Sequence, residues 1–137
     1  MKKILVAVDG SETSVHAARK ALELGEALKA EVTLATVVVP TFVPPEVAFD
    51  ASRFIEESVR IGELTLEQVA RQLGTPTISR VTLQGSIGES LADFADQAHF
   101  DLIVVGSKGR GAVARVLIGS TTDRLVHISR KPVLVVR

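Results

Sequence analysis

The sequence contains no cysteine, and its 16 lysine and arginine residues balance its 16 aspartate and glutamate residues. Without cysteine the chain forms neither disulfides nor thiolate metal sites, and a reducing compartment suits it, so we expect a cytoplasmic protein. A net charge near zero argues against a protein that binds nucleic acid by bulk electrostatic attraction.

Long apolar runs are also missing. Two lysines precede the apolar stretch at the start of the chain, but the polar residues from Asp9 to Glu12 end that stretch far short of a membrane span or a signal peptide. We therefore expect no membrane segment and no export signal. The 137 residues suit one domain over residues 1–137.

Short runs rich in Val, Ile and Leu alternate with longer segments of helical period, which is typical of βαβ units around a parallel sheet. These runs predict strands over 3–8, 31–38, 77–83, 101–105 and 132–136. Arg80 and Thr82 make the third run more polar, which suits an edge strand.

Apolar residues at three- and four-residue spacing predict helices over 12–28 and 50–73. Capping-box spacing at Ser86 and Glu89 predicts a third helix, and the same spacing at Ser120 and Asp123 predicts a last helix from Thr121 to about Ser129. The sequence thus predicts an α/β fold with a parallel sheet.

The connection over residues 40–49 holds three prolines, which exclude a helix or a central strand there. Two interpretations stay open for this loop. Either Phe42 and Phe49 simply pack against the domain, or the segment is a lid. As a lid it would cover a site at the sheet edge that also carries the glycines from Gly106 to Gly111.

A cluster of glycines follows the fourth predicted strand, from Gly106 to Gly111, and Gly119 and Ser120 precede the last helix. Glycine lets main-chain N–H groups approach an anion without interference from a Cβ atom, and a helix N-terminus adds unpaired N–H groups with a partial positive charge. This combination is typical of a phosphate site.

The first predicted strand ends at Asp9, and the fourth ends at Gly106. In open α/β sheets, ligands bind beyond the carboxyl ends of the strands, where the strand order reverses. If these two strands are neighbours there, Asp9 faces the glycine loop across one crevice. Asp9 has two compatible interpretations: a turn or helix-cap residue, or an acid that holds a ribose hydroxyl or Mg²⁺.

Other nucleotide motifs and catalytic patterns fit poorly. No Walker A motif is present, and the dinucleotide-like match from Gly109 to Ala114 is neither at the first βα turn nor followed by an acid at the end of the next strand. His16, His99 and His127 lack metal-ligand spacing, and no serine has a nucleophile-elbow context. No residue is evident to orient a hydrolytic water, so catalysis has little support.

The spacing Gly106, two residues, Gly109, nine residues, Gly119 and then Ser120 resembles the motif of the ATP-binding branch of the universal stress protein family. The resemblance extends over Lys3 to Ser11 and Lys131 to Val136. It implies a three-layer, Rossmann-like fold of the adenine nucleotide alpha hydrolase kind, with five parallel strands in the order 3-2-1-4-5. It also implies an ATP-binding stress-response module, with a weak Mg²⁺-dependent ATPase or phosphotransferase as the alternative.

The resemblance further implies where ATP would lie, and the acid at the strand end, Asp9, is our candidate for holding Mg²⁺ bound with it. Asp9 and Gly106 would lie near the ribose, and the Val37 main chain would meet the adenine. The phosphates would be held by Gly109, Gly119, Ser120 and the N–H of Thr121. Lys108 and Arg110 would either add charge-assisted contacts or be solvated. The implied ATP-binding residues are Ala7, Val8, Asp9, Val37, Gly106, Ser107, Lys108, Gly109, Arg110, Gly119, Ser120 and Thr121.

The family resemblance also implies a homodimer. The apolar run Val133 to Val136 would be an edge strand, and such an edge favours pairing with a second copy.

Overall fold

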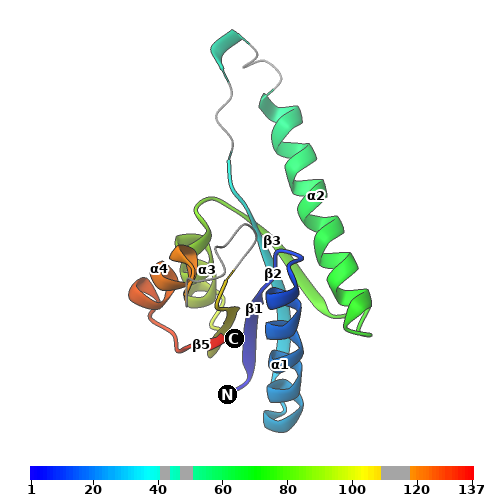
Figure 1. The fold of residues 1–137 in the computed structure, drawn as a ribbon, viewed down its shortest axis with the longest axis vertical. Helices are drawn as coiled ribbons and strands as arrows, with labels where there is room; N and C mark the ends of the chain where they lie inside the picture. Colours follow the sequence, from blue (N-terminus) through cyan, green and yellow to red (C-terminus); the bar gives the residue numbers. More distant parts are fainter. Residues whose placement is uncertain (41–43, 47–50, 109–117) are drawn as a thin grey trace.

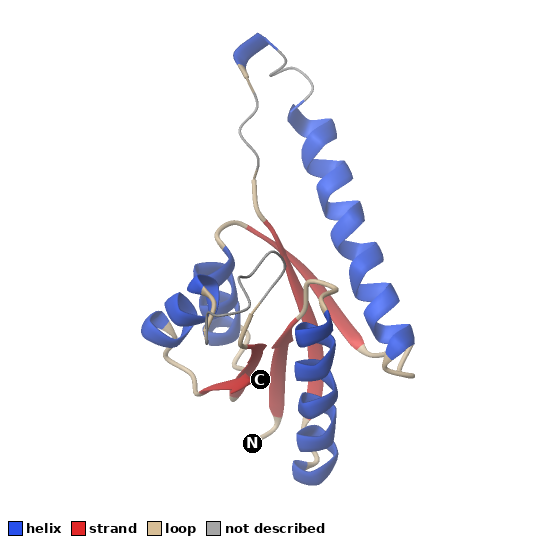
Figure 2. Ribbon diagram, in the orientation of Figure 1, coloured by secondary structure: helices blue, strands red, loops and turns tan. Residues whose placement is uncertain are grey.

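The computed structural model describes residues 1–40, 44–46, 51–108 and 118–137 (Figure 1). Within them the strands form one parallel sheet (Figure 2). Its order, β3-β2-β1-β4-β5, confirms the expected order and places the polar β3 at an edge. Each strand begins and ends within two residues of its predicted bounds. The strands are β1 (Lys3–Ala7), β2 (Glu31–Val38), β3 (Ser79–Gln84), β4 (Leu102–Gly106) and β5 (Val133–Val136).

Helices cover both faces of the sheet (Figure 1). The first matches its predicted bounds, and Gly74, at φ 72°, follows the end of the second, as expected from the sequence. The first predicted residue of the second helix, Asp50, lies outside the described residues. The helices are α1 (Glu12–Leu28), α2 (Ala51–Gln72), α3 (Ile87–Gln97) and α4 (Ser120–Ile128).

The side chains of β1 alternate between two hydrophobic clusters, one on each face of the sheet. Ile4 and Val6 pack with residues of α1 and α2, whereas Leu5 packs with residues of α3 and α4. All three side chains are fully buried. The molecule therefore has three layers, and β1 runs through the middle of its core.

The capping predictions need correction at both later helices. Ser86 is the N-cap residue of α3, but its side chain makes no capping hydrogen bond. For α4 the N-cap is Gly119, in an extended conformation, so the helix begins at Ser120 and the prediction of Ser120 as a cap is wrong. The Gly119 carbonyl, which accepts the Asp123 N–H at 2.9 Å, starts the helix one residue earlier than expected.

In the proline-rich connection the structure describes one short turn at Pro45 and Glu46. Phe42 and Phe49, on which the packing and lid interpretations depend, lie outside the described residues. In the part of the chain that is described, none of the helices has the length and apolar character needed to cross a membrane.

Candidate functional site

The carboxyl ends of β1 and β4 lie side by side at the point where the strand order reverses. Their register pairs Ile4 with Leu102 and Val6 with Val104. From this edge the chain continues from β1 into α1 on one face, and α4 covers the other face. The first turns of α1 and α4 therefore flank the carboxyl ends of β1 and β4, the place where open α/β sheets bind their ligands; we call this place the crevice.

Asp9 begins the tight turn between β1 and α1. Its Oδ1 accepts the Ser11 N–H at 2.9 Å, and its own N–H donates to Ser14 Oγ at 3.2 Å. Ser11 caps α1 by accepting the Ser14 N–H, and Gly10 takes the positive φ of 86° that the turn requires. The turn interpretation of Asp9 is thus confirmed, and the same turn fixes its carboxylate at the end of β1.

Gly106 lies against the first turn of α1. A Cβ atom on Gly106 would lie 3.1 Å from the Thr13 carbonyl oxygen and 3.4 Å from Thr13 Cβ, so a larger residue would push α1 away from the strand end. From α1, Thr13 Oγ1 donates to the Lys108 carbonyl oxygen at 2.7 Å. The strand end and the helix start are therefore tied together across the crevice.

Beyond the loop the chain returns to the same place. The Gly119 N–H donates to the Ser107 carbonyl oxygen at 2.6 Å, and Thr122 Oγ1 donates to the Gly106 carbonyl oxygen at 2.9 Å. These bonds place the N-terminus of α4 beside the end of β4, with Ser120 and Thr121 exposed. The first N–H groups of a helix have no intrahelical partner and carry a partial positive charge, so this end favours an anion.

The charged side chains of α4 are directed away from that end. Asp123 Oδ1 lies 3.6 Å from His127 Nδ1 on the exposed side of the helix. Arg124 donates to Glu89 Oε1 of α3 at 2.9 Å, and this hydrogen bond is the main cause of a lowered pKa for the Glu89 carboxyl. Asp123 thus lies where water screens its charge.

Val37 lies on β2, two residues beyond Ala35, whose carbonyl oxygen accepts the Val8 N–H at 2.8 Å. Because residues two apart on a strand direct their main-chain groups to the same side, Val37 presents its N–H and C=O toward the crevice, past the end of β1. The Val8 side chain is buried in the core, so only the Val8 main chain is available to line the crevice.

The structure thus brings most of the predicted residues to one edge. Gly109 and Arg110 lie outside the described residues. Thr13 and Thr122 were not among the predicted residues. A threonine in the first turn of each helix that follows β1 or β4 was the available signal, but it has meaning only once those strands are known to be neighbours.

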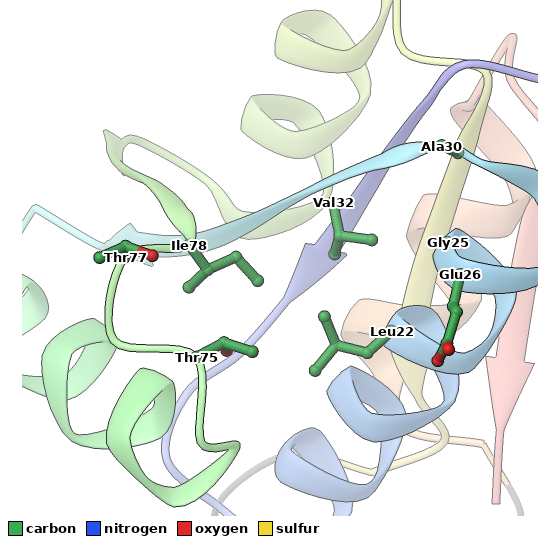
Figure 3. Close-up of a pocket in the computed structure, with 8 residues that line it drawn as sticks. All are labelled: Leu22, Gly25, Glu26, Ala30, Val32, Thr75, Thr77 and Ile78. Carbon is green, nitrogen blue, oxygen red and sulfur yellow. The ribbon is translucent and has the colours of Figure 1, made fainter.

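Within the described ranges, no group of three histidine or acidic side chains is arranged to ligate a metal. A hollow of about 550 Å³ lies at the opposite ends of the strands from the crevice, between α1 and the segment that leads into β3. Leu22, Val32 and Ile78 point into it (Figure 3). It begins at the amino ends of β2 and β3, so it is separate from the crevice.

The family model for the universal stress protein family matches residues 1–137. A universal stress protein from Methanocaldococcus jannaschii is 32% identical over 140 residues, which cover 99% of this chain and 82% of that protein.

Two solved structures extend the likeness to three dimensions. The structure of UspA from Lactobacillus plantarum is 26% identical with a TM-score of 0.85, and the match covers 99% of this chain and 97% of that one. A universal stress protein in complex with cAMP, also 26% identical, has a TM-score of 0.66, with 99% and 97% covered. On this agreement of sequence and fold, the chain belongs to the universal stress protein family.

Proposed function

We propose that this protein binds ATP in the crevice between β1 and β4 and acts as a nucleotide-dependent stress-response module. The observation that carries the proposal is the meeting of three segments at that edge: the Asp9 turn, the strand end at Gly106, and the start of α4 at Gly119. Each of the last two belongs to the glycine motif of the family's ATP-binding branch.

The chemistry of the three segments suits the three parts of ATP. The N–H groups of Ser120 and Thr121 and the Ser120 hydroxyl would hold phosphate at the start of α4. The Asp9 carboxylate would accept a hydrogen bond from the ribose, and the Val37 N–H and C=O would pair with the edge of the adenine. A main-chain contact of this kind depends on strand register and not on the Val37 side chain.

The relative in complex with cAMP supports an adenine nucleotide as the ligand, because it shares this fold over nearly the whole chain. The Gly-Ser end of the motif and the helix start behind it favour a ligand with a longer phosphate chain. ATP would therefore occupy more of the hydrogen-bond donors in the crevice than a cyclic monophosphate would.

Mg²⁺ usually binds protein through one or two carboxylates and completes its coordination with phosphate oxygens and water. The single carboxylate of Asp9 at the strand end fits that pattern, whereas the described residues offer no cage that would hold the ion without nucleotide. Mg²⁺ bound with ATP would neutralise phosphate charge beside Asp9.

Calorimetric titration of the protein with Mg²⁺-ATP tests the proposal. We expect saturable binding, and we expect Asp9→Asn to weaken it about tenfold without lowering the midpoint of thermal unfolding, because a charged acceptor is lost. Asparagine keeps an oxygen for the Ser11 N–H, so the turn survives. Asp93→Asn, on the exposed side of α3, removes the same charge and should bind as the wild type does.

Wild-type protein that shows no heat of binding and no thermal shift with Mg²⁺-ATP would contradict the proposal. An Asp9→Asn variant with wild-type affinity would leave Asp9 with its turn role alone.

A single-turnover experiment with labelled ATP separates this module from a weak Mg²⁺-dependent ATPase or phosphotransferase. Recovery of intact ATP from the complex is the expected result. Turnover that Asp9→Asn abolishes would favour the enzyme instead.

A further inference from the structure

The main chain that leads from β4 toward the glycine loop is tied to the protein at three successive carbonyl oxygens. Gly106 O accepts from Thr122 Oγ1, Ser107 O accepts from the Gly119 N–H, and Lys108 O accepts from Thr13 Oγ1. The distances are 2.9, 2.6 and 2.7 Å. The Ser107 N–H is held as well, by the Val136 carbonyl oxygen of β5 at 2.9 Å.

Carbonyl oxygens repel phosphate, whereas N–H groups attract it. A trans peptide is planar, so a donor that fixes the direction of a carbonyl fixes the plane of that peptide. Hydroxyl groups that hold carbonyls inside the protein therefore keep the repelling ends of the peptides turned away from an anion. This ordering is complete before any ligand arrives, which lowers the cost of binding.

The two hydroxyls come from helices on opposite faces of the sheet. Thr13 belongs to α1 and Thr122 to α4, so the main chain at the end of β4 accepts hydrogen bonds from both faces of the sheet. Thr122 is buried, so its hydroxyl reaches Gly106 O from inside the protein, and Thr13 reaches Lys108 O because Gly106 lets α1 lie so close. A carbonyl that loses the threonine hydroxyl is no longer held in this direction by that donor.

We infer that Thr13 and Thr122 are positioning residues of the nucleotide site, which hold the strand end in the form that receives phosphate. The inference rests on the proposed function and names the side chains that prepare that site. Neither threonine needs to touch the nucleotide. Loss of either hydroxyl lowers the fraction of molecules that are ready to bind, and the apparent affinity falls by that fraction.

The test compares Mg²⁺-ATP affinity and the thermal midpoint for Thr13→Val, Thr13→Ser, Thr122→Val and Thr122→Ser. We expect each valine to weaken ATP binding about tenfold, the effect of one lost hydrogen bond, and each serine to restore affinity to within about twofold. Rescue by serine distinguishes the hydroxyl from the shape of the side chain. The matched control is Thr65→Val, because Thr65 Oγ1 also donates to a main-chain oxygen, Ile61 O, at 3.0 Å, but on α2.

Valine variants that fold and bind Mg²⁺-ATP as tightly as the wild type would overturn the inference while leaving the proposed function intact. Failure of the wild type itself to bind would remove the proposed function, and the inference with it. If Thr122→Val fails to fold because its site is buried, the Thr13 pair at the half-buried site still decides the outcome.

Discussion

The residues proposed for the crevice differ in whether their side chains already make hydrogen bonds within the protein. Asp9 is committed to the turn through the Ser11 N–H, and the same bond fixes where its carboxylate lies. Thr13 is committed to Lys108 O. Ser120, by contrast, is exposed and is not needed as a cap, because Gly119 takes that position. We propose that its hydroxyl binds phosphate.

Asp101 has a structural role at the other end of the same strands. Its Oδ2 accepts the N–H groups of Lys2 at 2.8 Å and Lys3 at 2.9 Å, and these bonds hold the pKa of the Asp101 carboxyl below its ordinary value. A carboxyl with a lowered folded pKa stabilises the protein above its unfolded pKa, near 4, and loses that effect as the pH falls through the folded pKa.

We therefore predict that Asp101→Asn lowers the free energy of unfolding at pH 7 and that the difference from the wild type shrinks as the pH falls below about 4. Urea denaturation between pH 7 and pH 3 measures it. Asp93→Asn controls for the loss of one negative charge. A difference that stays constant across this range would show that the charge of Asp101 does not contribute.

Among the elements, α2 depends on one glycine for its fit to the sheet. A Cβ atom on Gly62 would lie 3.2 Å from methyl groups of Thr36, Val38 and Thr82, which belong to β2 and β3. Because Gly62 has no side chain, the helix lies closer to these strands than another residue would allow. Its position over the β2–β3 edge follows from that contact.

Gly62→Val should destabilise the protein by about 1–3 kcal/mol, because overpacking a tight contact outweighs the small gain in helix propensity. Urea unfolding at pH 7 measures the change. Glu63→Val places the same side chain on the exposed face of α2 and should change stability by less than about 0.5 kcal/mol. Equal stabilities of Gly62→Val and wild type would mean that α2 shifts without cost.

For the whole molecule, the free edge of the sheet at β5 supports the homodimer expected from the sequence. Val136 O faces β4, since it accepts the Ser107 N–H, so the alternate residues Val133 and Val135 direct their main-chain groups outward. β5 is apolar, and among the described residues no strand pairs with its outer side, so its outward N–H and C=O groups favour pairing with a second copy. We propose antiparallel pairing of two β5 strands across a two-fold axis.

Val135→Pro removes an outward N–H without removing a bond to β4, and we expect it to convert the dimer to a folded monomer. Light scattering after size-exclusion chromatography measures the mass. Arg80→Pro is the matched control on the opposite edge, where the main chain of Arg80 also faces away from the neighbouring strand. A wild-type monomer, or a dimer that both proline variants keep, would contradict pairing through β5.

Most strands and helices were predictable from the sequence, because apolar runs mark the strands and apolar residues at three- and four-residue spacing mark the helices. The order of the strands was not: it came from the resemblance that the glycine motif carries. The capping predictions were wrong because the spacing of Ser86 and Glu89, or of Ser120 and Asp123, does not determine whether the serine side chain accepts a hydrogen bond from the first turn. Thr13 and Thr122 escaped prediction because their partners lie on another strand end, which only the folded chain brings near.

The proposed function depends most on whether ATP binds between β1 and β4. Amide chemical shifts of the labelled protein, followed during titration with Mg²⁺-ATP, locate the ligand directly. The account predicts saturable changes at Asp9, Val37, Ser107, Ser120 and Thr121, with little change at Val32 and Ile78 in the hollow at the opposite ends of the strands. Changes confined to that hollow, or none at saturating Mg²⁺-ATP, would contradict it.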